Sequence, residues 1–160
     1  MERIVLFPGS FDPFTRGHAA LVEQALRLFN RVVVGIGSNP EKQGLLPVEN
    51  RRRLIADLYA HEPRVEAQVY TGLTGDFARH MGACAILRGV RNTTDFEYER
   101  TMEATNRRIY PDLTTVMLFT PSDVADIASS TVREVLAFGR SVDEFMPQGI
   151  RIEDYFIKKN

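Results

Sequence analysis

Residues 8–18 place glycines, a serine and a histidine in an order that could bind phosphate. The segment, PGSFDPFTRGH, lies between an apolar run and a helix-like pattern. Gly9 and Gly17 let the backbone turn and approach a ligand closely, and Ser10 adds a hydroxyl donor at the rim. His18 falls in the first turn of the expected helix, where unpaired N–H groups and the helix dipole favour an anion. The segment therefore predicts a phosphate site.

Two further segments carry groups that suit phosphate oxygens. Arg88 and Arg91 follow an apolar run and stand three positions apart. Planar guanidinium groups donate in pairs, so both are candidates for an anion site, although arginines more often form surface ion pairs. Ser129, Ser130 and Thr131 begin a later helical pattern, where their hydroxyls could cap the helix, bind phosphate or do both.

Strand-like and helix-like patterns alternate along the whole chain. We expect strands at 3–7, 31–37, 65–70, 83–88 and 113–119, and helices at 17–29, 48–60, 75–81, 95–109, 129–138 and 151–158. A Thr-Thr-Asp cluster at 93–95 suits capping of the longest helix. The alternation predicts an α/β fold: a single Rossmann-like domain over residues 1–160, with a five-stranded parallel sheet, helices on both faces, right-handed crossovers and ligands at the carboxyl ends of the strands. The first turn lacks the Gly-x-Gly-x-x-Gly spacing of dinucleotide-binding proteins, so NAD binding is disfavoured.

Composition limits the class of protein further. The chain is 44% hydrophobic and 26% charged, and its net charge of −1 provides no global positive field to hold nucleic acid or an anionic membrane. The single cysteine, Cys84, opens an apolar run at 84–87 that reads as a buried strand, and it suits a reduced, cytoplasmic setting. No signal-peptide core and no run of about 20 apolar residues is present, so we expect the mature protein to start near Met1.

Several of these segments together resemble the nucleotidyltransferase superfamily and, within it, the phosphopantetheine adenylyltransferase family. The likeness covers nearly the whole chain. It is carried by 9–13 with 15–18, similar to the (H/T)xGH signature, by 87–91 with 95–99, and by 127–135, similar to an ISSS motif. Ala128 stands where a serine is common, and 124–126 lacks the aromatic residues often found there. The resemblance implies adenylyl transfer from ATP to 4′-phosphopantetheine, giving dephospho-coenzyme A and pyrophosphate.

The resemblance also implies which residues meet each reactant. The catalytic group would be Ser10, His18, Lys42, Arg91 and Ser129. The ATP site would comprise Ser10, Phe11, His18, Gly89, Val90, Arg91, Glu99, Val124, Ala125, Asp126, Ile127, Ala128, Ser129 and Ser130. The 4′-phosphopantetheine site would comprise Ser10, Lys42, Thr74, Arg88, Met102 and Asn106. Mg²⁺ would bridge the ATP phosphates with much of its water retained and no dedicated metal motif, and the family implies a homohexamer with coenzyme A as a feedback ligand.

Other interpretations remain open. A nicotinamide mononucleotide adenylyltransferase or a cytidylyltransferase would share the phosphate site, and a noncatalytic sensor could bind ATP without turnover. Lys42, in a polar loop, could simply be solvated. We assign no chemistry to His61 and His80, and we expect the run 51–53, all arginine, to be a solvated helix start or an interface feature. Glu97 and Arg100 are expected to be helix-face charges.

Overall fold

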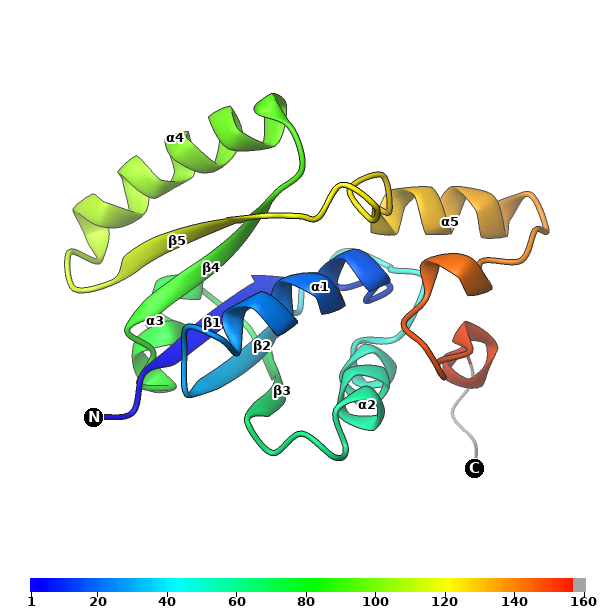
Figure 1. The fold of residues 1–160 in the computed structure, drawn as a ribbon, viewed down its shortest axis with the longest axis horizontal. Coiled ribbons are helices and arrows are strands. Elements are labelled where there is room, and N and C mark those ends of the chain that lie inside the picture. Colours follow the sequence, from blue (N-terminus) through cyan, green and yellow to red (C-terminus); the bar gives the residue numbers. More distant parts are fainter. Residues whose placement is uncertain (157–160) are drawn as a thin grey trace.

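The computed structural model describes residues 1–156, which form one sheet with helices on both sides (Figure 1). The strands are β1 (Ile4–Gly9), β2 (Arg31–Gly37), β3 (Val65–Tyr70), β4 (Ala85–Val90) and β5 (Thr114–Phe119). The helices are α1 (Arg16–Ala25), α2 (Val48–Leu58), α3 (Thr74–His80), α4 (Thr93–Ile109) and α5 (Ser129–Ala137), followed by the short 3-10 helices η1 (Asp143–Phe145) and η2 (Ile152–Tyr155). All pairs are parallel, in the order β3-β2-β1-β4-β5. The predicted fold class is confirmed.

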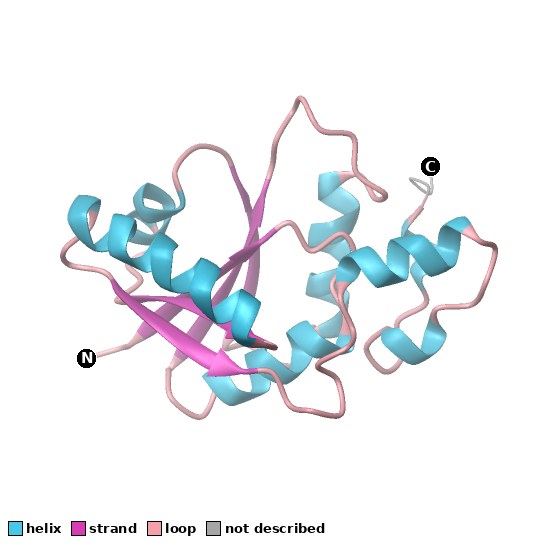
Figure 2. Cartoon of the chain, turned by 90° about the horizontal axis from the view of Figure 1, so that it is seen from above, coloured by secondary structure: helices cyan, strands magenta, loops and turns pink. Residues whose placement is uncertain are grey.

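Alternating side chains of the central strand β1 divide the core into two layers. Val5 and Phe7 pack in the larger layer, where α1, α2 and α5 cover the sheet. Ile4 and Leu6 face the opposite side and pack with Ala78 of α3. This alternation is the period-two pattern of a strand that is buried on both faces. Figure 2 shows helices on both sides of the strands.

The C-terminal segment closes the larger layer beside α2. Met146 and Ile152 are buried in the same cluster as the strands. The side-chain amide of Asn50 in α2 donates to the carbonyl of Tyr155 at 2.6 Å, which satisfies a buried polar group and fixes this segment against the helix.

Several observed element boundaries differ from the predicted ones. The strand predicted at 83–88 is Ala85–Val90, because pairing with β1 begins at Val5 opposite Ala85. Cys84 therefore lies before the strand and is exposed, so its prediction as a buried strand residue was wrong. The helix predicted at 17–29 ends at Ala25, and turns follow it.

Two helix ends also differ from the predictions. The longest helix begins at Thr93 and its N-cap is Asn92, whose side chain accepts the Asp95 N–H at 2.9 Å. The capping residue thus precedes the Thr-Thr-Asp cluster. Of the helix predicted at 151–158, only the 3-10 turn Ile152–Tyr155 forms, and residues 157 and 158 lie outside the described part.

Helix α4 lies along the outer part of the sheet and buries one polar residue against it. Glu99 is its one buried residue, whereas Phe96, Tyr98 and Met102 are exposed. The apolar side chains of α4 therefore face away from this chain's core. None of the helices within residues 1–156 combines the length and hydrophobicity needed to cross a bilayer.

Candidate active site

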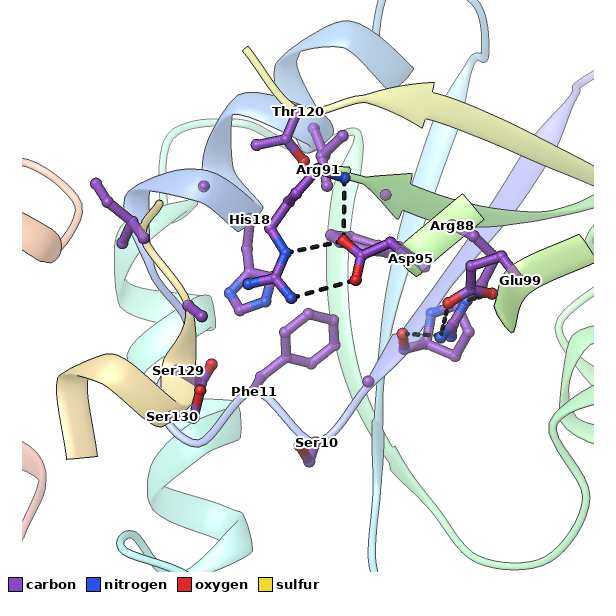
Figure 3. A pocket seen from close by; sticks show the side chains of 18 of the residues that line it. Ser10, Phe11, His18, Arg88, Arg91, Asp95, Glu99, Thr120, Ser129 and Ser130 are labelled. Atoms are coloured by element: carbon purple, nitrogen blue, oxygen red, sulfur yellow. Dashed lines mark hydrogen bonds and ion pairs between the residues drawn. The ribbon is translucent and has the colours of Figure 1, made fainter. Parts of the chain in front are cut away.

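A cavity of about 400 Å³ opens at the carboxyl ends of β1 and β4. These strands are neighbours at the point where the strand order reverses, which is where open parallel sheets bind ligands. Residues drawn from distant parts of the sequence meet here (Figure 3). Of the predicted site residues, those that line the cavity are Ser10, Phe11, His18, Arg88, Gly89, Arg91, Glu99, Ile127, Ala128, Ser129 and Ser130.

Other predicted residues lie elsewhere. Lys42 lines a second cavity, described below. Among the described residues, Val90, Thr74, Met102, Asn106 and the stretch 124–126 belong to the lining of neither cavity. Thr74, the first residue of α3, forms a hydrogen bond between its hydroxyl and that of Tyr70, at 2.9 Å.

Val124, in the stretch 124–126, nevertheless packs against the start of α1, which lines the cavity. A Cβ at Gly17 would stand 3.1 Å from the Ile127 carbonyl oxygen and 3.4 Å from that of Val124. The lack of a side chain at Gly17 therefore lets α1 begin directly against this loop.

His18 is held in one orientation by the start of its own helix. Thr15, the fully buried N-cap residue of α1, donates its backbone N–H to His18 Nδ1 at 3.0 Å, and its hydroxyl lies 3.2 Å from the same nitrogen. Because Nδ1 accepts a hydrogen bond, the proton of the neutral ring is on Nε2. The arrangement fixes a neutral imidazole with one remaining donor.

The surroundings of His18 keep it neutral. Its ring packs edge-on against Phe11, with ring centroids 5.0 Å apart, and in a tilted arrangement against Phe14, at 5.3 Å. Burial, and secondly the charge of Arg91, lower the pKa of His18 from 6.5 to about 4. At neutral pH His18 can therefore donate a hydrogen bond to a phosphate oxygen but carries no charge of its own.

Arg91 is held at the cavity wall by Asp95, in the first turn of α4. Its Nε donates to Asp95 Oδ2 at 3.0 Å, and the backbone N–H of Arg91 donates to the same oxygen at 3.0 Å. Burial raises the pKa of Asp95, but the hydrogen bonds and charge of Arg91 outweigh it and hold the pKa below its ordinary value. The pair orients the guanidinium group beside His18 (Figure 3).

Arg88 is matched by a second carboxylate on the same face of α4. Its Nε and Nη2 donate to the two oxygens of Glu99, each at 2.7 Å, and its Nη1 donates to the Pro8 carbonyl at 3.4 Å. The Glu99 side chain is only 9% exposed. Glu99 thus orients Arg88 and balances its charge, a contact that the predicted assignment of Glu99 to ATP did not include.

The N-terminus of α5 forms the wall opposite the arginines. Its N-cap, Ala128, has no side-chain acceptor, so no side chain caps the first amides of the helix. Ser129 instead donates its hydroxyl to the Pro13 carbonyl at 2.8 Å, which ties α5 to the loop after β1. This loop, residues 10–15, is called the phosphate loop after the phosphate site that the sequence predicts there. Uncapped amides, together with the helix dipole, provide a second region that favours an anion.

Comparison with known proteins identifies this arrangement. A family model described as cytidylyltransferase-like matches residues 6–135, which include the whole lining of the first cavity. The phosphopantetheine adenylyltransferase of Porphyromonas gingivalis is 45% identical over 152 residues, covering 95% of this chain and 99% of that protein. Those of Bacteroides thetaiotaomicron and Anaeromyxobacter dehalogenans are 40% and 38% identical over 150 residues, 94% of this chain and 99% and 92% of those proteins. The chain belongs to the phosphopantetheine adenylyltransferase family.

This membership confirms the predicted family and the nucleotidyltransferase class. Among solved structures, a bifunctional NMN adenylyltransferase/ADP ribose pyrophosphatase from Francisella tularensis, complexed with AMP and a manganese ion, superposes with a TM-score of 0.68. The match covers 95% of this chain and 46% of that one at 17% identity. At this identity the likeness shows the fold alone.

In this member of the phosphopantetheine adenylyltransferase family, Lys42 belongs to a neighbouring cavity of about 760 Å³. The two cavities share Ser10 and Arg133 in their linings. Lys42 lies in the loop between β2 and α2, and its backbone N–H donates to the Asn39 carbonyl at 3.1 Å. Two adjoining cavities with cationic walls suit a reaction that joins two anions.

Sequence reasoning missed several residues of the site. Arg133 stands one turn after Ser129 on α5, a spacing that places both on one helix face and could have identified it. Thr120 lines the first cavity just after β5 and carried no sequence signal. Arg51, expected to belong to a solvated helix start or an interface feature, has a side chain that is 11% exposed and is paired with Asp12, so the solvated alternative is wrong for this residue.

Proposed function

We propose that this chain transfers the adenylyl group of ATP to 4′-phosphopantetheine. An oxygen of the acceptor phosphate attacks the α-phosphorus, the bond to the bridging oxygen of the β-phosphate breaks, and pyrophosphate leaves. The product is dephospho-coenzyme A. Relatives named phosphopantetheine adenylyltransferase, which match nearly the full length at 38–45% identity, support the choice of these two substrates.

One observation carries the chemical part of the proposal. His18, Arg91 and the uncapped N-terminus of α5 line one cavity at the ends of β1 and β4. A phosphate monoester is already ionised near neutral pH, so the acceptor needs no general base. The protein must instead hold two anions in line and stabilise the charge that spreads over the transferred group.

Within this scheme each group has a separate task. The Nε2–H of His18 donates to an oxygen of the transferred phosphate, and Arg91 with the first amides of α5 bind the triphosphate. Lys42 and Arg88 bind the phosphate of the acceptor, while Ser10 stands between the two cavities. Thr74, Met102 and Asn106 are proposed to contact the pantetheine arm. Val90 and residues 124–126 are proposed to contact the adenosine.

Magnesium fits this site as a companion of ATP. Both carboxylates in the cavity, Asp95 and Glu99, are engaged by arginines. Within residues 1–156, no three His, Cys, Asp or Glu side chains gather in a metal-binding cluster. The triphosphate oxygens and water would therefore hold Mg²⁺, and when bound it would supply charge neutralisation at the leaving pyrophosphate.

The assembly and regulation of the chain are proposed on separate grounds. Phe96 and Tyr98 of α4 and Phe119 of β5 are exposed, and such a surface suits contacts between copies in a homohexamer. Coenzyme A shares the pantetheine arm of the acceptor, so it would bind the same site as a feedback ligand. The free thiol of Cys84 suits a reducing, cytoplasmic setting.

A substrate-resolved assay tests the proposed function. Pyrophosphate release is measured from ATP and CTP, each with 4′-phosphopantetheine, nicotinamide mononucleotide and glycerol phosphate. We expect turnover with ATP and 4′-phosphopantetheine; a clear preference for another pair would assign the chain to a different nucleotidyltransferase activity. Calorimetric binding of ATP without turnover of any acceptor would favour the nucleotide sensor.

A further inference from the structure

Asp12 connects the two loops that carry the proposed contacts to the reactants. This residue of the phosphate loop is 6% exposed. Its Oδ2 accepts the N–H of Leu45 at 2.7 Å and its Oδ1 accepts the N–H of Leu46 at 2.8 Å. Both leucines belong to the loop that carries Lys42. A single buried carboxylate therefore attaches the Lys42 loop to the phosphate loop.

Arg51 of α2 completes this connection. Its Nε lies 3.3 Å from Asp12 Oδ1 and donates to the Leu46 carbonyl at 2.8 Å, while its Nη1 donates to the Ser10 carbonyl at 3.2 Å. The packing is close, because a Cβ at Gly44 would overlap the Arg51 guanidinium group and lie 2.6 Å from Asp12 Oδ2. One guanidinium group thus touches both loops.

Arg51 lines the same cavity as Lys42, and the contacts just described hold it against protein atoms of both loops. Its charge is balanced by Asp12, and its Nε and Nη1 donors are used by backbone carbonyls. Both carbonyls belong to the loops that carry Ser10 and Lys42. The chemistry of the contact is therefore that of a brace between two segments.

We propose that Asp12 and Arg51 form a positioning pair that sets where Lys42 stands relative to Ser10, and so aligns the acceptor phosphate with the nucleotide. The inference rests on the proposed function for its effect on turnover. Joining two anions requires a fixed geometry, and a displacement of about 1 Å can cost a factor of about 10² in rate.

A double-mutant cycle between Arg51 and Lys42 tests the pair. We expect Arg51→Met to lower kcat/KM for 4′-phosphopantetheine by about 10- to 100-fold, with Arg51→Lys retaining part of the activity because it keeps the charge next to Asp12. ATP affinity should change by less than about threefold, because His18 and Arg91 are held by other contacts. The matched control is Arg52→Met, the next residue on α2, whose exposed pair with Glu49 touches neither loop; it should behave like the wild type.

The cycle separates positioning from a general structural role. If Arg51 acts through Lys42, the loss in Lys42→Ala/Arg51→Met is smaller than the product of the two single losses, since misplacing an absent group costs nothing. Losses that multiply fully would overturn the proposal.

Hydrogen exchange provides a test that does not depend on turnover. The amides of Leu45 and Leu46 should be protected in the wild type and exchange at least about tenfold faster in Asp12→Asn, which replaces one acceptor oxygen by a donor. Should Asp12→Asn not fold, Arg51→Lys and Arg51→Met give the same comparison. Equal protection in wild type and variants would refute the brace, whereas a wild type that adenylylates no acceptor would refute only the proposed function.

Discussion

The backbone N–H of Thr15 donates to Nδ1 of His18 at 3.0 Å, so the N-cap of α1 leaves Nε2 as the donor nitrogen of the imidazole. The side-chain amide nitrogen of glutamine can reach the position of histidine Nε2, whereas the shorter asparagine side chain cannot. The burial that lowers the pKa of His18 to about 4 leaves the neutral donor as the active form across the neutral range.

Replacement of His18 should therefore discriminate between two amides. We expect His18→Asn to lower kcat by roughly 10²–10³, the effect of removing one preorganised donor at the transferred phosphate. His18→Gln, whose amide nitrogen reaches the Nε2 position, should retain more activity. Steady-state kinetics on folded variants measures both. Unchanged turnover in His18→Asn would remove His18 from the mechanism, and equal losses would remove the assigned tautomer.

The same histidine should make the stability of the protein depend on pH. Its pKa is about 4 when folded and 6.5 ordinarily, so between these values the unfolded chain binds more protons than the folded one. The free energy of unfolding should therefore fall as pH is lowered from 6.5 to 4, by about 3 kcal/mol at about 1.4 kcal/mol per pKa unit. Urea denaturation across this range measures it. In His18→Gln this contribution should vanish; an identical pH profile would show that His18 is not its source.

The Arg88–Glu99 pair should show a structural effect that can be separated from ligand binding. Arg88→Met leaves the buried Glu99 carboxylate without its partner and should cost about 3 kcal/mol of unfolding free energy, the low end of the range for a broken buried pair, because Arg88 is partly exposed. Arg88→Met/Glu99→Met should recover most of this stability, yet both variants should lose affinity for the acceptor.

A matched control for this pair is Arg79→Met, which breaks the exposed pair of Arg79 with Asp112 and should cost less than about 1 kcal/mol. Thermal or urea denaturation together with KM for 4′-phosphopantetheine provides the comparison. If the double variant stayed as unstable as Arg88→Met, an unpaired carboxylate would not be the cause.

Local sequence signals predicted the strands and placed the loop after β1 and the arginines at the end of β4, which line one cavity, because each depends on residues within one turn or strand. The burial of Arg51 could not be predicted in this way. It depends on Asp12, which lies in another loop and meets Arg51 only after β1, β2 and α2 have packed. Exposure of Cys84 likewise depends on where β1 pairing begins. The burial of such residues is determined by contacts between segments that are distant in the sequence, and the residues next to them in the sequence do not indicate those contacts.

Substitution of the N-cap residue of α5 should change the free energy of unfolding and the affinity for ATP in opposite directions. Ala128 is the N-cap and lines the cavity. An aspartate there should accept a backbone N–H and favour the helix dipole, which raises the free energy of unfolding by about 0.5–1 kcal/mol. The same carboxylate would compete with the triphosphate for those amides and repel it, so ATP affinity measured by calorimetry should fall at least about tenfold. Ala128→Ser caps without charge and should change ATP affinity by less than about threefold. If Ala128→Asp bound ATP as tightly as the wild type, the triphosphate would not lie at this helix.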